Sequence, residues 1–101
     1  MRRGEIRVHN PLVPRPGVAP LRLVISADDL NAAPLPFVIV LHVVTEDPRV
    51  PRYAIRLSRF GWAIATTLES TLRSRVGYVV GQASAEEMAA VDEALRLAQG
   101  L

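Results

Sequence analysis

The chain contains 101 residues, of which 50% are hydrophobic, and carries a formal net charge of +2 at pH 7. This length allows one hydrophobic core, so we expect a single domain over residues 1–101. The absence of cysteine excludes disulfides, thiolate metal sites and cysteine nucleophiles, and the longest apolar run, residues 37–44, is too short to cross a membrane. We expect a cytoplasmic protein that uses neither a metal ion nor a cofactor.

The positive charge is concentrated in the first three quarters of the chain. All twelve basic residues are Arg: residues 1–75 contain eleven of them against six acidic residues, whereas residues 76–101 contain one Arg and four acidic residues. Arg binds phosphate through two parallel hydrogen bonds, so this distribution favours nucleic acid as a partner. The alternative is that the preference for Arg over Lys reflects the base composition of the genome.

The N-terminal half predicts three strands and a long loop. Residues 4–10, GEIRVHN, alternate apolar and polar side chains as a half-buried strand does. Residues 11–20 contain four Pro and one Gly, which predicts a loop longer than a turn, and such loops are often functional. Strands are expected over residues 21–28 and 37–45, joined by a connection, and the latter is apolar on both faces, as a central strand would be.

Three further strands and one helix complete the prediction. The strands cover residues 52–58, 63–72 and 76–81. Ser84 and Glu87 match a capping box, and apolar residues then recur at helical spacing before Gly100, so we expect a C-terminal helix over about residues 84–99. The fold class is therefore mainly β with a C-terminal helix, as a small SH3-like barrel or a strongly bent antiparallel sheet.

Five segments, in this order, resemble the MazF/PemK toxins of bacterial type II toxin–antitoxin pairs. They are MRRGEI, LVISADDLN, VIVLHVVT, GWAIATTLESTLRSRVG and VGQASAEEMAAVDEAL, and together they cover nearly the whole chain. The resemblance implies a CcdB/MazF-like toxin barrel, a homodimer, and growth inhibition by metal-independent, sequence-specific endoribonuclease cleavage of single-stranded RNA through attack of the 2′-OH. It also implies a cognate antitoxin, and the basic barrel face suits an acidic, disordered antitoxin segment.

Two other functions stay open at this point. The related CcdB toxins share the fold but act on DNA gyrase, so the chain could be a toxin-fold protein without nuclease activity. Such a protein would be a topoisomerase poison or a degenerate antitoxin-binding partner. The other possible function is that of an SH3-like adaptor, which would be neither a nuclease nor a toxin.

The sequence departs from the family pattern at one catalytic position. MazF-like toxins carry Arg-Pro directly before the strand that aligns with LVIS, where this chain has Pro20 and Leu21. Arg15 and Arg22 are the candidates to replace that arginine, and strand alternation predicts that Arg22 faces solvent beside the loop. The resemblance maps a second catalytic residue, a threonine, onto Val44 in an ungapped alignment or onto Thr45 with a one-residue slip, and Thr45 is the match we expect.

The other candidates follow from the chemistry of RNA cleavage. Without a metal, the reaction needs a base for the 2′-OH proton, an acid for the 5′-oxygen and a cation for the phosphorane. His9, at the end of the first strand, is either the catalytic base or an ordinary surface histidine, whereas His42 is expected in the core or an interface. Trp62 is either a base-stacking platform or a core or dimer anchor. Two Arg pairs that share strand faces are candidates to bind phosphate, with a solvated sheet face as the alternative: Arg52 with Arg56, and Arg73 with Arg75.

Overall fold

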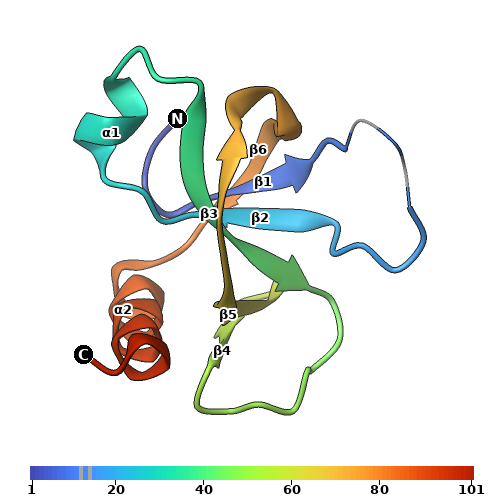
Figure 1. Cartoon of the computed structure of the whole chain (residues 1–101). Coiled ribbons are helices and arrows are strands. Elements are labelled where there is room, and N and C mark those ends of the chain that lie inside the picture. Colours follow the sequence, from blue (N-terminus) through green and yellow to red (C-terminus); the bar gives the residue numbers. More distant parts are fainter. Residues whose placement is uncertain (12, 14) are drawn as a thin grey trace.

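Six strands form one antiparallel sheet, and a helix packs on one of its faces (Figure 1). The computed structural model describes residues 1–11, 13 and 15–101. Its elements in chain order are β1 (Glu5–His9), β2 (Leu21–Val24), α1 (Asp28–Ala32), β3 (Phe37–Val44), β4 (Ala54–Leu57), β5 (Gly61–Leu72), the 3-10 turn η1 (Arg73–Arg75), β6 (Val76–Gln82) and α2 (Ala85–Gln99).

The strand order β4-β5-β3-β2-β1-β6 puts β3 inside the sheet, between β2 and β5. This confirms the prediction of a central third strand, which rested on its two apolar faces. β4 and β6 are the two edges, so the sheet is open (Figure 1). Of the two architectures expected from the sequence, the bent antiparallel sheet is the one observed.

One face of the sheet carries the main hydrophobic core, which α2 covers. The strand residues that are fully buried there are Ile6, Leu23, Leu41, Val43 and Leu57. Met88 and Val91 of α2 pack among them. The helix begins with the expected capping box of Ser84 and Glu87, and it ends at Gly100, whose φ of 73° suits glycine. The C-terminal helix predicted from the sequence is therefore confirmed.

The opposite face of the sheet carries a row of polar side chains. Arg7 on β1 lies directly opposite Arg22 on β2, which in turn lies opposite His42 on β3. Residues paired in this way on antiparallel strands have Cβ atoms about 4.5–5.5 Å apart, so their side chains are neighbours. Arg7 is held by Glu5 and by the Gly77 carbonyl. The other two form part of the site described below.

The short helix α1 is not predicted by the sequence pattern, which indicates only a connection between two strands. Buried Asn31 stabilises this single turn, because its amide group donates to the Ser26 carbonyl and accepts from the Ser26 hydroxyl. A helix of five residues shows too little periodicity to be recognised.

Arg73 and Arg75 do not share a strand face, contrary to the prediction, because β5 ends at Leu72 and a 3-10 turn follows. The Arg73 guanidinium turns instead to the end of α1, where it donates to the carbonyls of Leu30, Ala33 and Leu35. Arg73 therefore joins the β5–β6 corner to α1, and its hydrogen bonds compete with any contact to a phosphate backbone.

Candidate active site

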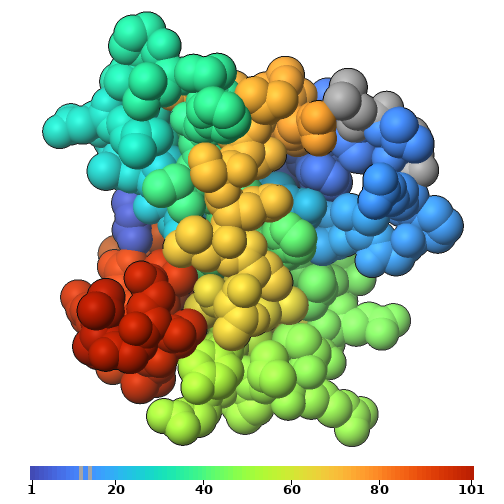
Figure 2. Space-filling model, in the orientation of Figure 1, coloured from blue at the N-terminus to red at the C-terminus, as the bar shows by residue number. Residues whose placement is uncertain are grey.

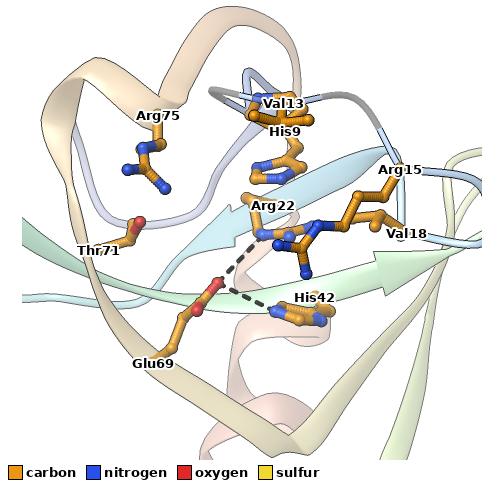
Figure 3. A pocket seen from close by; sticks show the side chains of 10 residues that line it. His9, Val13, Arg15, Val18, Arg22, His42, Glu69, Thr71 and Arg75 are labelled. Carbon is orange, nitrogen blue, oxygen red and sulfur yellow. Dashed lines mark hydrogen bonds and ion pairs between the residues drawn. The ribbon is translucent and has the colours of Figure 1, made fainter.

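A pocket of about 450 Å³ lies between the polar face of the sheet and the loop that joins β1 to β2. Figure 2 shows this loop, in blue, standing out at one side of the molecule. Side chains of the strands form one part of the pocket and side chains of the loop another (Figure 3). The lining residues are His9, Pro11, Val13, Arg15, Val18, Arg22, His42, Glu69, Thr71 and Arg75.

Arg22 is buried, with 3% of its surface exposed, so the predicted solvent-facing position is wrong. Alternation along β2 misleads here because both faces of the strand are covered. On the face of Arg22, Val24 belongs to a second buried cluster with Val38, Val40 and Val76. The Nη1 atom of Arg22 donates to the carbonyls of Ala19 and Leu21, at 2.9 and 3.0 Å. Burial lowers the pKa of Arg22 from its usual value, and the carboxylate of Glu69 opposes that shift. The guanidinium is nonetheless a fixed cation at neutral pH, because arginine keeps its proton in proteins.

Glu69 joins two site residues through one carboxylate oxygen. Its Oε1 lies 3.0 Å from Nε2 of His42 and 3.3 Å from Nε of Arg22, as the dashed lines in Figure 3 mark. The Nε of Arg22 is at ion-pair distance, but it has no hydrogen-bond partner among the residues that the structure describes. The side chains of His42 and Glu69 are 32% and 41% exposed, so both remain open to the pocket.

A bulge in β5 brings Glu69 to His42. Val40 pairs with Glu69, but two residues further along β3, His42 pairs with Ile64, so residues 65–68 are looped out of the ladder. The backbone N–H of His42 donates to the hydroxyl of Thr67, inside the bulge, at 2.9 Å. The bulge therefore sets the position of both members of the pair.

His9 ends β1 and lies on the other side of Arg22 from His42 (Figure 3). Its backbone N–H donates to the Pro20 carbonyl at 2.9 Å, which joins the two ends of the loop. Burial lowers the pKa of His9 below its usual 6.5, and the positive charge of Arg22 lowers it further. The imidazole is therefore neutral at pH 7 and able to accept a proton.

Two more arginines reach the pocket from separate elements. Arg15 extends from the exposed part of the loop towards Arg22, and Arg75 comes from the turn after β5 (Figure 3). With Arg22 they bring three guanidinium groups to one cavity, where Glu69 supplies the one carboxylate among the described lining residues. The pocket is therefore suited to an anion such as phosphate.

Thr45 lies in a second pocket, of about 590 Å³, which is also lined by Pro20 and shares Val18 and His42 with the first. The predicted catalytic group is therefore divided between two neighbouring cavities. His9, Arg15 and Arg22 line the first, and Thr45 lines the second. His42, which the sequence places in a core or interface, is a polar side chain common to both.

Arg52 and Arg56 lie away from these pockets, and Arg52 precedes β4 instead of sharing a strand face with Arg56. The Arg52 guanidinium lies 5.9 Å from the centre of the Tyr53 ring, and that of Arg56 lies 4.3 Å from the centre of the Trp62 ring. Trp62 on β5 pairs with Arg56 on one side and with Val44 on the other, and Val44 lines the second pocket. The stacked Arg56–Trp62 pair therefore extends the same face of the sheet.

Residues 3–98 match the model of one protein family, described as PemK-like, MazF-like toxin of type II toxin–antitoxin system. The chain belongs to this toxin family. The resemblance noted from the sequence segments is thus confirmed, and the toxin's polar pocket lies within the matched residues.

Solved structures share the fold of this toxin over nearly its whole length. An endoribonuclease from a Mycobacterial species, in complex with its cognate antitoxin, is 21% identical with a TM-score of 0.79, covering 100% of this chain and 96% of that one. A chain of the MazE–MazF complex from Deinococcus radiodurans is 21% identical with a TM-score of 0.81, covering 100% and 97%. The Mycobacterium tuberculosis toxin MazF-mt6 is 16% identical with a TM-score of 0.76, covering 96% and 97%. No curated protein sequence matches the chain.

Three polar residues of the toxin's pocket carry weak signals in its sequence. His42 interrupts an apolar strand and so resembles a core residue, while Glu69 and Thr71 resemble the polar side of an alternating strand. Only the bulge brings Glu69 to His42, and alternation cannot reveal a change of register. A polar residue within each of two adjacent strands is the one signal that could have indicated the pair.

Across the part of the toxin that the structure describes, no helix is long and apolar enough to span a membrane. Within the same residues, no three His, Cys, Asp or Glu side chains gather as a metal site would require. The groups present in the pocket are cations, imidazoles and a carboxylate, which can bind phosphate and exchange protons.

Proposed function

We propose that this toxin is an endoribonuclease that cleaves single-stranded RNA without a metal ion. The observation that supports it most is the convergence of three arginines and two histidines, from separate elements, on one cavity. Membership of the MazF-like toxin family agrees with it, as does the likeness to a Mycobacterial endoribonuclease.

The proposed reaction is attack of the 2′-OH on the adjacent phosphorus. His9 is the base, because its imidazole is neutral at pH 7 and lines the pocket. Arg22 and Arg15 stabilise the negative charge of the phosphorane, the first as a buried cation held by backbone carbonyls, the second from the exposed loop. These two arginines would replace the catalytic arginine of the family, whose position is occupied by Pro20 in this chain.

The RNA strand would run from the first pocket into the second and onward across the sheet. In the second pocket Thr45 would donate a hydrogen bond to the strand, and beyond it the Arg56–Trp62 pair offers a platform for a base. At the other end Arg75 would bind phosphate. Arg52, beside Tyr53, would add positive charge at the margin of this path.

We further propose that an antitoxin with an acidic, disordered segment silences the toxin by occupying the same path in the cytoplasm. Two of the similar structures are complexes of a toxin with its antitoxin. The segment would contact exposed Arg15 and Arg56 and so cover the pocket that Arg22 lines. The complex should then fail to bind RNA; unchanged RNA binding by the complex would refute the overlap.

The activity is tested by incubating the purified toxin with a long RNA in the presence of EDTA and mapping breaks by primer extension. We expect breaks at a short recurring sequence, produced equally by the Arg2→Ala control, in which an exposed arginine remote from the pocket lining is removed. If the toxin cleaves no RNA under any condition, Pro20 marks a lost active site. The favoured function would then be that of a CcdB-like topoisomerase poison or of an antitoxin-binding partner without nuclease activity.

A further inference from the structure

We propose that His42, positioned by Glu69, is the general acid that protonates the 5′-oxygen leaving group. This inference rests on the proposed endoribonuclease function, and it assigns the acid that the family resemblance leaves without a residue. Glu69 acts through His42 and is therefore a positioning residue, whereas His42 would touch the reacting atoms.

The hydrogen bond between the two residues determines which ring nitrogen faces the substrate. A carboxylate only accepts hydrogen bonds, so His42 Nε2, 3.0 Å from Glu69 Oε1, must carry the hydrogen. Nδ1 is then the nitrogen that can take up or release a proton during the reaction. The carboxylate thus fixes one tautomer and one ring orientation.

His42 is also held from its backbone. Its N–H donates to the hydroxyl of Thr67, and that hydroxyl donates to the Ile64 carbonyl at 2.7 Å. These bonds replace the regular ladder where residues 65–68 bulge, directly before Glu69. A bulge of this kind re-aims side chains, so the strand geometry and the carboxylate together fix the imidazole.

The pair lies where an acid is needed. His42 lines both pockets and so lies beside the point where the RNA would pass from one pocket to the other. His9 lies on the far side of Arg22 (Figure 3), so a phosphate bound to Arg22 would have one imidazole on each side. An in-line displacement requires the base and the acid on opposite sides of the phosphorus.

A purely structural ion pair would need only Arg22 and Glu69. The same carboxylate oxygen, however, also bonds to a half-exposed imidazole that opens on both cavities. The Nε of buried Arg22 lies 3.3 Å from that oxygen, so the carboxylate stands between a fixed cation and the imidazole.

In the proposed step one histidine takes up a proton and the other releases one. His9 removes the proton from the 2′-OH as the O2′–P bond forms, and the P–O5′ bond breaks while Nδ1–H of His42 gives its proton to O5′. The products are a 2′,3′-cyclic phosphate and a 5′-hydroxyl. His42 is left neutral with its Nε2–H still donated to Glu69, and exchange with water restores both imidazoles.

The titratable and charged groups that line the two pockets together with His42 come from several elements. They are Arg22 from β2, Glu69 from β5, His9 from β1, Arg75 from the turn after β5, and Arg15 and Glu46 from loops.

The test uses an oligonucleotide that contains the mapped cleavage site, prepared in two forms. One is ordinary RNA, and the other has sulfur in place of the 5′-bridging oxygen at the scissile bond. A thiolate leaves without being protonated, so this second substrate does not need a general acid. His42→Ala should cleave ordinary RNA about 10²–10⁴-fold more slowly than the wild type and the sulfur substrate at close to the wild-type rate. His9→Ala should be slow on both.

Glu69→Gln should show the same rescue by sulfur, with kcat reduced on ordinary RNA and KM little changed. Glu86→Gln, which alters an exposed carboxylate at the start of α2, is the matched control and should behave as the wild type on both substrates.

The outcomes separate the two proposals. A wild type that cleaves neither substrate overturns the endoribonuclease function, and this inference with it. A wild type that cleaves RNA, beside a His42→Ala variant that is either fully active or equally slow on both substrates, overturns only the role of His42. Full activity of Glu69→Gln overturns the positioning role.

Discussion

The Nε atom of Arg22 lies 3.3 Å from Oε1 of Glu69, so a buried cation is paired with a half-exposed carboxylate in the pocket. Two backbone carbonyls hold the same guanidinium from the loop side. Arg22 therefore supports the junction of loop and sheet as well as the site.

Arg22→Ala should destabilise the fold as well as remove cleavage. The substitution removes two hydrogen bonds to the partly buried carbonyls of Ala19 and Leu21 and the ion pair with Glu69, a loss of about 1–3 kcal/mol. Urea unfolding monitored by circular dichroism measures the loss. Arg2→Ala, on the exposed N-terminus, should stay within about 0.5 kcal/mol of the wild type. An equally small change in Arg22→Ala would contradict its buried position.

Arg15→Ala should separate activity from stability. Arg15 is exposed on the loop, so its removal should change the free energy of unfolding by less than about 0.5 kcal/mol. If Arg15 meets the scissile phosphate, the cleavage rate should fall by about 10²–10³-fold. Single-turnover rates with excess toxin provide the comparison, and a rate equal to that of the wild type would remove Arg15 from the mechanism.

His9 should make both stability and cleavage sensitive to acid. Its pKa in the folded chain lies below the usual 6.5, so the unfolded chain binds the proton more readily. Above about pH 6.5, His9 therefore does not lower the free energy of unfolding. Below that pH, the free energy of unfolding should fall as the pH drops through the lowered pKa of His9. The cleavage rate should fall over the same range because the base becomes protonated. In His9→Asn that part of the stability loss should be absent; an identical profile would show that His9 is not responsible.

The toxin should form a two-fold symmetric dimer, and an exposed apolar surface beside α1 is the expected contact. Phe37 and Leu72 pair across β3 and β5 and are 46% and 37% exposed, with Leu68 nearby on β5 at 47%. They adjoin an apolar cavity of about 170 Å³ that is lined by Leu30, Leu35, Phe37, Val38, Ile39 and Ser70. Burying such a surface favours self-association. Light scattering at micromolar concentration should give twice 11.1 kDa, and Phe37→Glu should give the monomer. A wild type of 11 kDa alone would contradict the dimer.

Much of the fold follows from local patterns in the sequence. The alternation in β1, the apolar run of β3 and the capping box of α2 each depend on neighbours within a few residues. The helix α1 does not, because it depends on the bonds between Ser26 and Asn31 and has no periodicity of its own.

The site was harder to predict because its geometry depends on non-local features. The sequence predicts a functional loop, and Arg15, Arg22, His9 and Arg75 do line one pocket. The burial of Arg22 goes with its contacts to the carbonyl of Ala19 and to Glu69 on another strand, and the pairing of His42 with Glu69 depends on the bulge in β5. Neither feature can be predicted from the spacing of residues in the sequence. Their roles in catalysis stay predictions.

The most direct measurement compares the cleavage of two oligonucleotides by the toxin in the presence of EDTA. Both contain the mapped cleavage sequence, and they differ only in the sugar of the nucleotide before the cut, which is ribose in one and 2′-deoxyribose in the other. If the toxin cleaves through the 2′-OH, only the ribose form is cut, with a 2′,3′-cyclic phosphate and a 5′-hydroxyl as ends, while both bind with similar affinity. Equal cleavage of the deoxy form, or no cleavage of the ribose form, would contradict the proposed activity.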